Sequence, residues 1–174
     1  QAIGFFWNES FGQIYPELRR LAHAKSIKPL EAGGAGKRRT KRYRITAKGR
    51  EELTRWLRRA PRLERPRIEL LLKVFFGAVT GPSATRSFLE GAAAAYRGRL
   101  NALNAAEDLV IDEDRASGNL VYSLMTIASG KLIHAARIEW TRSALALLDA
   151  QERGGNEAVL KAYAQLKLPK GKGG

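Results

Sequence analysis

Six basic side chains occupy the eight positions from Lys37 to Arg44, in the stretch KRRTKRYR. A glycine-rich segment, EAGGAG, comes directly before them and favours a tight turn. Charges of one sign repel one another at this spacing, so the cluster is suited to an anionic partner such as the phosphate backbone of DNA. The side chains expected to contact phosphate here are Lys37, Arg38, Arg39, Lys41 and Arg42.

A helix that Ser10 or Asn8 can cap is expected just before this basic stretch. Its apolar residues share one stripe at helical spacing: Phe11, Ile14, Leu18 and Leu21. The opposite face carries polar groups that can reach base edges and phosphates. The polar side chains on this face that are candidates for DNA contact are Gln13, Arg19 and Arg20.

The elements around the basic stretch complete a small module. Two short strands, one with Ile27 and Leu30 and one with Tyr43 and Ile45, flank the glycine-rich tip. Thr46 can cap a following helix, residues 47–59. A basic hairpin that follows a polar helix face is the arrangement with which a winged helix-turn-helix binds DNA. A solvated charged loop is the plainer alternative for the hairpin.

The remainder of the chain is expected to be helical. Residues 61–82 form a linker and a short apolar helix that ends near Gly77, and long helices run from Ser83 to about residue 109 and from about 117 to 152. The acidic stretch IDEDRASGN is the expected turn between the two long helices, which then form an antiparallel hairpin. Their surface is too apolar for a single chain, so residues 83–152 are expected to form a dimerisation domain. Residues 153–174 are expected to be a partly disordered tail.

The predicted fold class is therefore mainly α with a small β-hairpin. A winged helix-turn-helix domain, residues 1–60, precedes a C-terminal dimerisation domain of long helices. The net charge of +14 follows the same division: residues 1–82 contain 19 Lys and Arg against 7 Asp and Glu, whereas residues 83–174 contain 12 against 10. The excess in the N-terminal module supports a polyanion as its partner.

Several classes of protein are disfavoured by what the sequence lacks. It has no cysteine, so disulfides and thiolate metal sites are excluded. His23 and His134 are its only histidines and lie far apart, and no nucleophile stands beside a base, so we expect no metal, no cofactor and no enzyme activity. No apolar run approaches the roughly 20 residues that span a bilayer, and no secretory signal begins the chain. A soluble cytoplasmic protein without a membrane partner is expected.

Two segments of the sequence resemble the PadR-like family of bacterial transcription regulators. They are Gly12-Gln13-Ile14-Tyr15-Pro16 with Leu18 and Leu21, and Tyr43-Arg44-Ile45-Thr46 with Gly49. The stretches ELLLKVFFGAV and HAARIEWTRSALALL resemble the branch whose C-terminal part is named for a virulence activator. The resemblance covers about residues 5–150. It implies that Ser10–Ala24 is the recognition helix and the basic hairpin is the wing, that the C-terminal helices form a dimer, and that the protein usually represses transcription. The DNA contacts that it implies on the recognition helix are Ser10, Gln13, Tyr15, Arg19 and Arg20. For Tyr15 two interpretations stay open, because its hydroxyl could reach a phosphate or its ring could belong to the core.

The sequence departs from the family pattern in two places. The family has a full first helix and most of a second before the aromatic segment, and this chain lacks them, so we expect residues before Gln1. The family usually has a glycine between the recognition helix and the first strand. Ser26 stands there in this chain, which leaves the geometry of that turn open.

The resemblance also implies a small-molecule effector. Similar proteins often sense small aromatic or drug-like molecules in the dimer interface and then release DNA. The candidates to line such a site here are Phe75, Tyr96, Tyr122, His134 and Trp140, with Phe76 near the domain junction. Ordinary core packing is the alternative for these residues, because aromatic side chains mainly supply buried area.

The function predicted from the sequence is that of a sequence-specific DNA-binding transcriptional regulator. It is expected to act as a repressor and to bind a pseudo-palindromic operator as a homodimer. Two alternatives remain: a sequence-independent basic nucleic-acid-binding protein, and a protein-interaction module in which the helical half is the main functional part.

Overall fold

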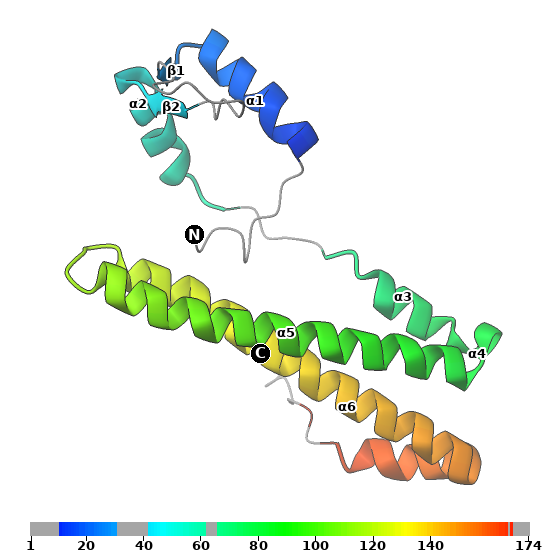
Figure 1. The fold of residues 1–174 in the computed structure, drawn as a ribbon. Coiled ribbons are helices and arrows are strands. Elements are labelled where there is room, and N and C mark those ends of the chain that lie inside the picture. Colours follow the sequence, from blue (N-terminus) through cyan, green and yellow to red (C-terminus); the bar gives the residue numbers. More distant parts are fainter. Residues whose placement is uncertain (1–10, 31–41, 62–65, 167, 169–174) are drawn as a thin grey trace, which may run out of the picture. The chain divides into compact units, whose positions relative to one another are not determined.

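The computed structural model describes residues 11–30, 42–61, 66–166 and 168 of the 174-residue chain. These residues belong to two compact units, which divide between Pro66 and Arg67. Figure 1 shows α1, β1, β2 and α2 in one unit and α3 to α6 in the other. The mainly helical fold with one small hairpin, as predicted from the sequence, is confirmed.

In the first unit, α1 (Phe11–His23) ends in a tight hydrogen-bonded turn. The Ser26 amide donates to the Leu21 carbonyl (2.9 Å) and the Lys25 amide donates to the Ala22 carbonyl (3.0 Å). These two bonds satisfy carbonyls that the end of a helix otherwise leaves free. They require Lys25 to adopt the left-handed conformation, with φ at 59°. Glycine is favoured at such a position because it has no Cβ to clash with the backbone.

The structure therefore answers the question that Ser26 raised. Ser26 is buried, with 3% of its surface exposed. Its Oγ donates to the Glu52 carboxylate (2.8 Å) and its carbonyl accepts from the Thr46 amide (3.0 Å). The left-handed position of the turn falls one residue earlier, on Lys25. Serine at position 26 is thus compatible with the turn, and its hydroxyl adds a bond that glycine could not make.

The hairpin consists of β1 (Ile27–Leu30) and β2 (Arg42–Ile45), which pair antiparallel. Ile27 lies opposite Ile45, and Lys28 lies opposite Arg44. Successive side chains of a strand point to opposite faces. The isoleucines are accordingly half-buried on one face, and the two cations are exposed on the other.

The start of α2 (Ala47–Leu57) is held against the turn that follows α1. The Oγ1 of Thr46 accepts from the Gly49 amide (3.0 Å) and donates to the Lys25 carbonyl (2.8 Å), so it caps the helix and contacts the turn. A Cβ on Gly49 would lie 2.0 Å from the Ser26 carbonyl oxygen. Only glycine permits this approach. The helix ends two residues before the predicted limit at 59.

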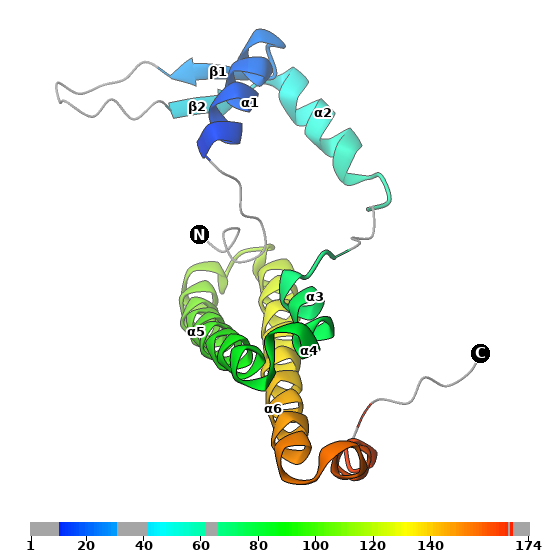
Figure 2. The same ribbon diagram turned by 90° about the vertical axis from the view of Figure 1, so that its right-hand side faces the viewer.

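In the second unit, the short helices α3 (Glu69–Phe75) and α4 (Gly77–Thr80) precede two long ones, α5 (Pro82–Asp114) and α6 (Leu120–Ala164). The two long helices lie side by side and antiparallel (Figures 1 and 2). The buried apolar side chains between them are Leu89, Ala93, Leu103, Ile127 and Ala150. A Cβ on Gly130 would lie 2.9 Å from the Leu103 side chain, so the helices approach closely at that level.

Four polar contacts fix the register of α5 on α6. They join Arg86 to Asp149 (2.7 Å) and Glu152 (3.0 Å), Glu107 to Lys131 (2.7 Å), and Asp114 to Ser123 (3.1 Å). Ion pairs that remain in contact with water contribute less than about 1 kcal/mol each. They therefore align the helices more than they stabilise them.

The predicted end of α5 is wrong. The sequence predicts an end near residue 109, but the helix continues to Asp114 and most of the expected acidic turn is helical. The stretch from Ile111 to Asp114 contains no glycine or proline to stop a helix. The start is also one residue early, at Pro82, where the fixed φ of proline suits the first turn.

The predicted limits of α6 are wrong as well. The helix begins at Leu120 rather than 117, and it continues past the expected end at 152 to Ala164. Gly154 (φ −156°, ψ 22°) and Gly155 (φ 60°, ψ −155°) leave helical geometry and bend the chain sharply (Figure 2). Part of the expected tail is therefore folded, while the stretch PKGKGG lies outside the described residues.

Replacing Lys25 by glycine is expected to stabilise the first unit, because it removes the strain of a left-handed residue that carries a Cβ. Lys25→Ala is the matched control, since it removes the same charge but keeps the Cβ. The free energy of unfolding in urea should be about 1 kcal/mol higher for Lys25→Gly than for Lys25→Ala. Equal stability of the two variants would show that backbone strain at Lys25 is negligible.

Candidate nucleic-acid interface

The side chains predicted to contact DNA from the recognition helix lie on the surface of α1. Gln13, Tyr15, Arg19 and Arg20 are all exposed. Tyr15 has 55% of its surface exposed, so it is largely in solvent rather than in a core. Ser10 lies outside the described residues. The helix thus offers an amide, a phenol and two guanidinium groups to a partner.

Arg20 is held by a carboxylate of its own helix. Its Nε lies 2.9 Å from Glu17 Oε1, and its Nη2 lies 2.5 Å from the same oxygen. The bond from Arg20 lowers the pKa of the Glu17 carboxyl, and the carboxylate raises the pKa of Arg20. The pair neutralises a predicted DNA contact and adds an acceptor to the helix surface. Glu17 is not among the residues predicted from the sequence, although a spacing of three residues from Arg20 is typical of such pairs.

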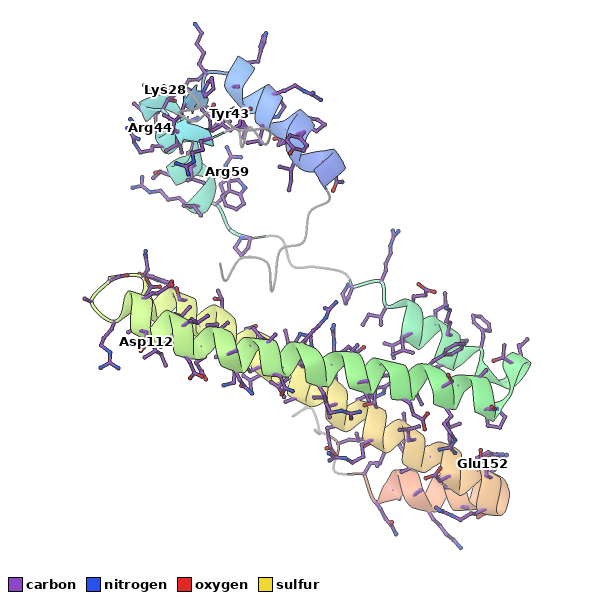
Figure 3. The ribbon with its side chains drawn as sticks, viewed as in Figure 1. Lys28, Tyr43, Arg44, Arg59, Asp112 and Glu152 are labelled. Atoms are coloured by element: carbon purple, nitrogen blue, oxygen red, sulfur yellow. The ribbon has the colours of Figure 1, made fainter. Side chains whose placement is uncertain are left out.

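The hairpin adds two cations that the prediction omitted. Lys28 on β1 and Arg44 on β2 lie directly opposite each other, and both are exposed (Figure 3). The predicted residue Arg42 shares their face, because it is two positions from Arg44 on the same strand. Neither Lys28 nor Arg44 forms an ion pair within the part of the chain that the structure describes. Like charges opposite each other destabilise a hairpin, so this face suits an anion.

Strand alternation was the signal that could have identified Lys28 and Arg44. The prediction was based on the density of charge at the hairpin tip, and it therefore missed a cation on the first strand. The predicted tip residues Lys37, Arg38, Arg39 and Lys41 lie outside the described residues.

Acidic side chains do not offset the positive charge of this unit. Residues 11–30 and 42–61 contain 11 Lys and Arg and three Glu. All three carboxylates have partners: Glu17 binds Arg20, Glu51 binds Arg55 (2.9 Å), and Glu52 binds Ser26 (2.8 Å). The described surface of the unit is therefore strongly positive, as a polyanion-binding surface requires.

Two of the predicted effector-binding residues meet in the second unit. The ring centroids of Tyr96 on α5 and His134 on α6 lie 6.0 Å apart, and the Arg137 guanidinium lies 5.4 Å from the centre of the Tyr96 ring. His134 is buried, and its Nδ1 has no hydrogen-bond partner among the described residues. Burial lowers the pKa of His134, and the positive charges of Arg137 and Arg99 lower this pKa further.

The other three effector candidates lie at different points along the unit. Phe75 on α3 and Tyr122 at the start of α6 are 80% and 67% exposed. Trp140 is half-buried, about five turns further along α6 than Tyr122. The structure thus brings Tyr96 and His134 together and does not bring the other three to them.

The described ranges of the chain contain neither a candidate metal site nor a helix that could span a membrane. No three His, Cys, Asp or Glu side chains are grouped there closely enough to hold a metal ion. No helix there is long and apolar enough to cross a membrane.

Comparison with known proteins relates both units to transcription regulators. Residues 1–55 match the Transcriptional regulator PadR-like family, and residues 66–149 match Virulence activator alpha C-term. The Negative transcriptional regulator PadR of Bacillus subtilis is 35% identical to this chain over 77 residues. This match covers 44% of the chain and less than half, 42%, of the relative's length.

Two solved structures share the fold over most of the chain. Bacillus subtilis PadR in complex with operator DNA has a TM-score of 0.70 and 24% identity, over 85% of this chain and 83% of that one. Bacillus subtilis PadR in complex with p-coumaric acid has a TM-score of 0.64 and 25% identity, over 86% of this chain and 84% of that one.

Buried His134 is expected to make the second unit sensitive to acid. The unfolded chain takes up a proton near the ordinary pKa of about 6.5, whereas the folded chain does so only at lower pH. Stability should therefore fall as the pH drops below about 6.5. In urea unfolding between about pH 7.5 and 5.5, His134→Gln should weaken this dependence. The control His23→Gln, at an exposed site on α1, should leave it unchanged, and the opposite pattern would contradict the role of His134.

Proposed function

This chain belongs to the PadR-like family of transcriptional regulators, and we propose that it binds operator DNA as a homodimer and represses transcription. One observation carries the proposal. The exposed pair of Lys28 and Arg44 lies on a hairpin whose first strand contacts α1, the helix with the exposed polar face. A helix with hydrogen-bonding side chains next to a cationic hairpin supplies both kinds of contact that specific DNA binding needs.

The helix and the hairpin have different roles in this proposal. The side-chain amide of Gln13 on α1 can donate one hydrogen bond and accept another at the same time. Adenine presents a matching acceptor, N7, and donor, N6, in the major groove. Cations on the hairpin contact phosphates, which fixes the position of the protein but reads no sequence. The phosphate-binding set comprises Lys28, Arg42 and Arg44, together with the tip residues Lys37, Arg38, Arg39 and Lys41.

Exposed apolar side chains in the second unit support the homodimer. Val79, Met125 and Leu132 have 82%, 65% and 71% of their surfaces exposed. Many large apolar side chains exposed on one unit are typical of an interaction surface. A dimer with two-fold symmetry presents two copies of α1, so its operator is a pseudo-palindrome with half-sites about 34–36 Å apart.

Repression and a small aromatic effector are supported by the relative from Bacillus subtilis. The name of that protein describes a negative regulator, and one of its structures contains p-coumaric acid. We propose the same sign and the same class of effector for this chain. Tyr96 and His134 are the candidate effector residues that lie together. An effector of this kind must bind the two conformations of the protein unequally in order to change its affinity for DNA.

A sequence-independent nucleic-acid-binding protein is the second candidate. The excess of 11 basic over three acidic side chains in the described part of the first unit favours it, because charge alone supports non-specific binding. Selection of bound duplexes from a random pool, at two salt concentrations, separates the candidates. An inverted repeat with half-sites one turn apart supports the dimeric regulator. Uniform binding that disappears with added salt supports the second candidate.

The double variant Lys28→Ala, Arg44→Ala is expected to weaken binding to the operator and to unrelated duplexes by the same factor. Each lost phosphate contact should also reduce the slope of log affinity against log salt by about 0.9. Arg38→Ala or Arg42→Ala should act in the same uniform way. Titration of labelled duplexes at several salt concentrations measures both quantities.

A matched control for the hairpin variant lies in the second unit. Arg153→Ala, Lys161→Ala removes the same charge from two exposed positions on α6. It should leave affinity nearly unchanged. An equal loss in this control would mean that total charge, rather than the hairpin, determines binding.

Gln13→Ala is expected to relax the preference for particular bases while it leaves binding to unrelated DNA intact. The removed amide is a base-reading group, and the loss at its position should be about 1–3 kcal/mol. Repeating the random-pool selection with the variant gives the measurement. If Gln13→Ala kept the base preference and Arg38→Ala changed it, the roles of helix and hairpin would be reversed.

A further inference from the structure

A cavity of about 540 Å³ lies at one end of the second unit. Its walls come from α3 and α4, the start of α5, and α6 on both sides of the bend at Gly154 and Gly155. The apolar lining includes Val74, Leu89 and Leu147. Pockets that bind small molecules have volumes of about 300–1,000 Å³ and mainly apolar walls, so this cavity is of the right size and character for a ligand.

The lining of the cavity is electrically neutral. None of the described residues that line it carries a charge. Arg86 is adjacent to the lining residue Thr85 on α5, and its guanidinium is paired with Asp149 (2.7 Å) and Glu152 (3.0 Å). Its charge is therefore balanced by carboxylates on α6. A charged ligand would find no counterion in the cavity, and moving it out of water would be costly.

The cavity nevertheless has a few polar groups. Thr85 is 5% exposed, and its Oγ1 already donates to the Gly81 carbonyl (3.4 Å). Gln151 and Asn156 line the cavity and are exposed. A side-chain amide both donates and accepts. These two groups can bind one hydroxyl, amine or carbonyl group of a ligand whose remainder lies against the apolar wall.

One wall of the cavity depends on the bend in α6. Asn156 and Val159 follow Gly154 and Gly155, and the bend brings them to the cavity. Gly155 has φ 60° and ψ −155°, a conformation that is essentially confined to glycine. No atom lies within 4 Å of the place where its Cβ would be. The glycine is therefore required by the bend itself, and not by crowding around it.

We propose that this cavity binds a small, neutral, predominantly apolar molecule that carries one hydrogen-bonding group. The site is distinct from the effector site proposed above, because none of Phe75, Tyr96, Tyr122, His134 and Trp140 lines it. The inference does not depend on DNA binding, since every described residue of the lining belongs to the second unit.

The first test uses the full chain and a neutral fluorescent probe, N-phenyl-1-naphthylamine, whose emission rises in apolar surroundings. Saturable binding of one probe per chain is expected. The anionic analogue 1-anilinonaphthalene-8-sulfonate has the same rings with a sulfonate, and it should not displace the neutral probe. Absence of saturable binding, or displacement by the anionic analogue at equal concentration, would overturn the proposal.

Variants locate the probe in the cavity. Ala144→Phe adds a ring to the wall on α6, and Ala78→Leu fills space from α4. Each should weaken probe binding, Ala144→Phe by at least about tenfold. The matched control is Ala146→Phe, two residues away on the exposed surface of α6 and not in the lining. It should bind the probe as the unaltered chain does.

Circular dichroism and size-exclusion chromatography of each variant complete the experiment. If Ala144→Phe and Ala78→Leu are folded and bind the probe with unchanged affinity, the proposed site is wrong. If Ala144→Phe instead changes the oligomeric state, while Ala146→Phe does not, the cavity is part of an interface between copies of the chain. That result would also overturn the proposal.

Discussion

The contact between the start of α2 and the turn after α1 determines the geometry of the first unit. A Cβ at Gly49 would lie 2.0 Å from the Ser26 carbonyl oxygen, and Thr46 bonds to both sides of this contact. The same turn ends α1 and begins β1. One contact between backbone segments therefore sets the direction of the exposed helix face and of the cationic hairpin together. This contact therefore also sets the spacing between Gln13, the proposed base-reading group, and the cations proposed to bind phosphate.

The described residues of the two units differ in burial. In the described part of the first unit only Ser26 and Gly49 are buried. Trp56 and Leu57 on α2 are 61% and 65% exposed. In the second unit, apolar side chains such as Leu89 are buried between α5 and α6.

The sequence predicted the features that depend on local patterns. Helical spacing identified α1, strand propensity and glycine identified the hairpin, and Thr46 was correctly recognised as a helix cap. The end of α6 was missed because Gly154 and Gly155 are strong breaking signals, and nothing local shows that a helix resumes after them. The position of the left-handed residue at Lys25 also could not be predicted, because lysine is not a residue type that favours this conformation. Strand alternation could have indicated that Lys28 and Arg44 are exposed, but their position directly opposite each other depends on the strand register.

The register of α5 on α6 limits how the hairpin that these two helices form can change in length. Near the start of α5, Arg86 contacts Asp149 on α6, and at the end of α5, Asp114 contacts Ser123. Between these two contacts the helices contain nearly the same number of residues. An insertion in one helix alone would separate every contact on the far side of it, including the pair between Glu107 and Lys131. Lengthening is therefore expected to occur by equal insertions in both helices, in steps of whole turns. Evolution of the hairpin is constrained to change both arms together.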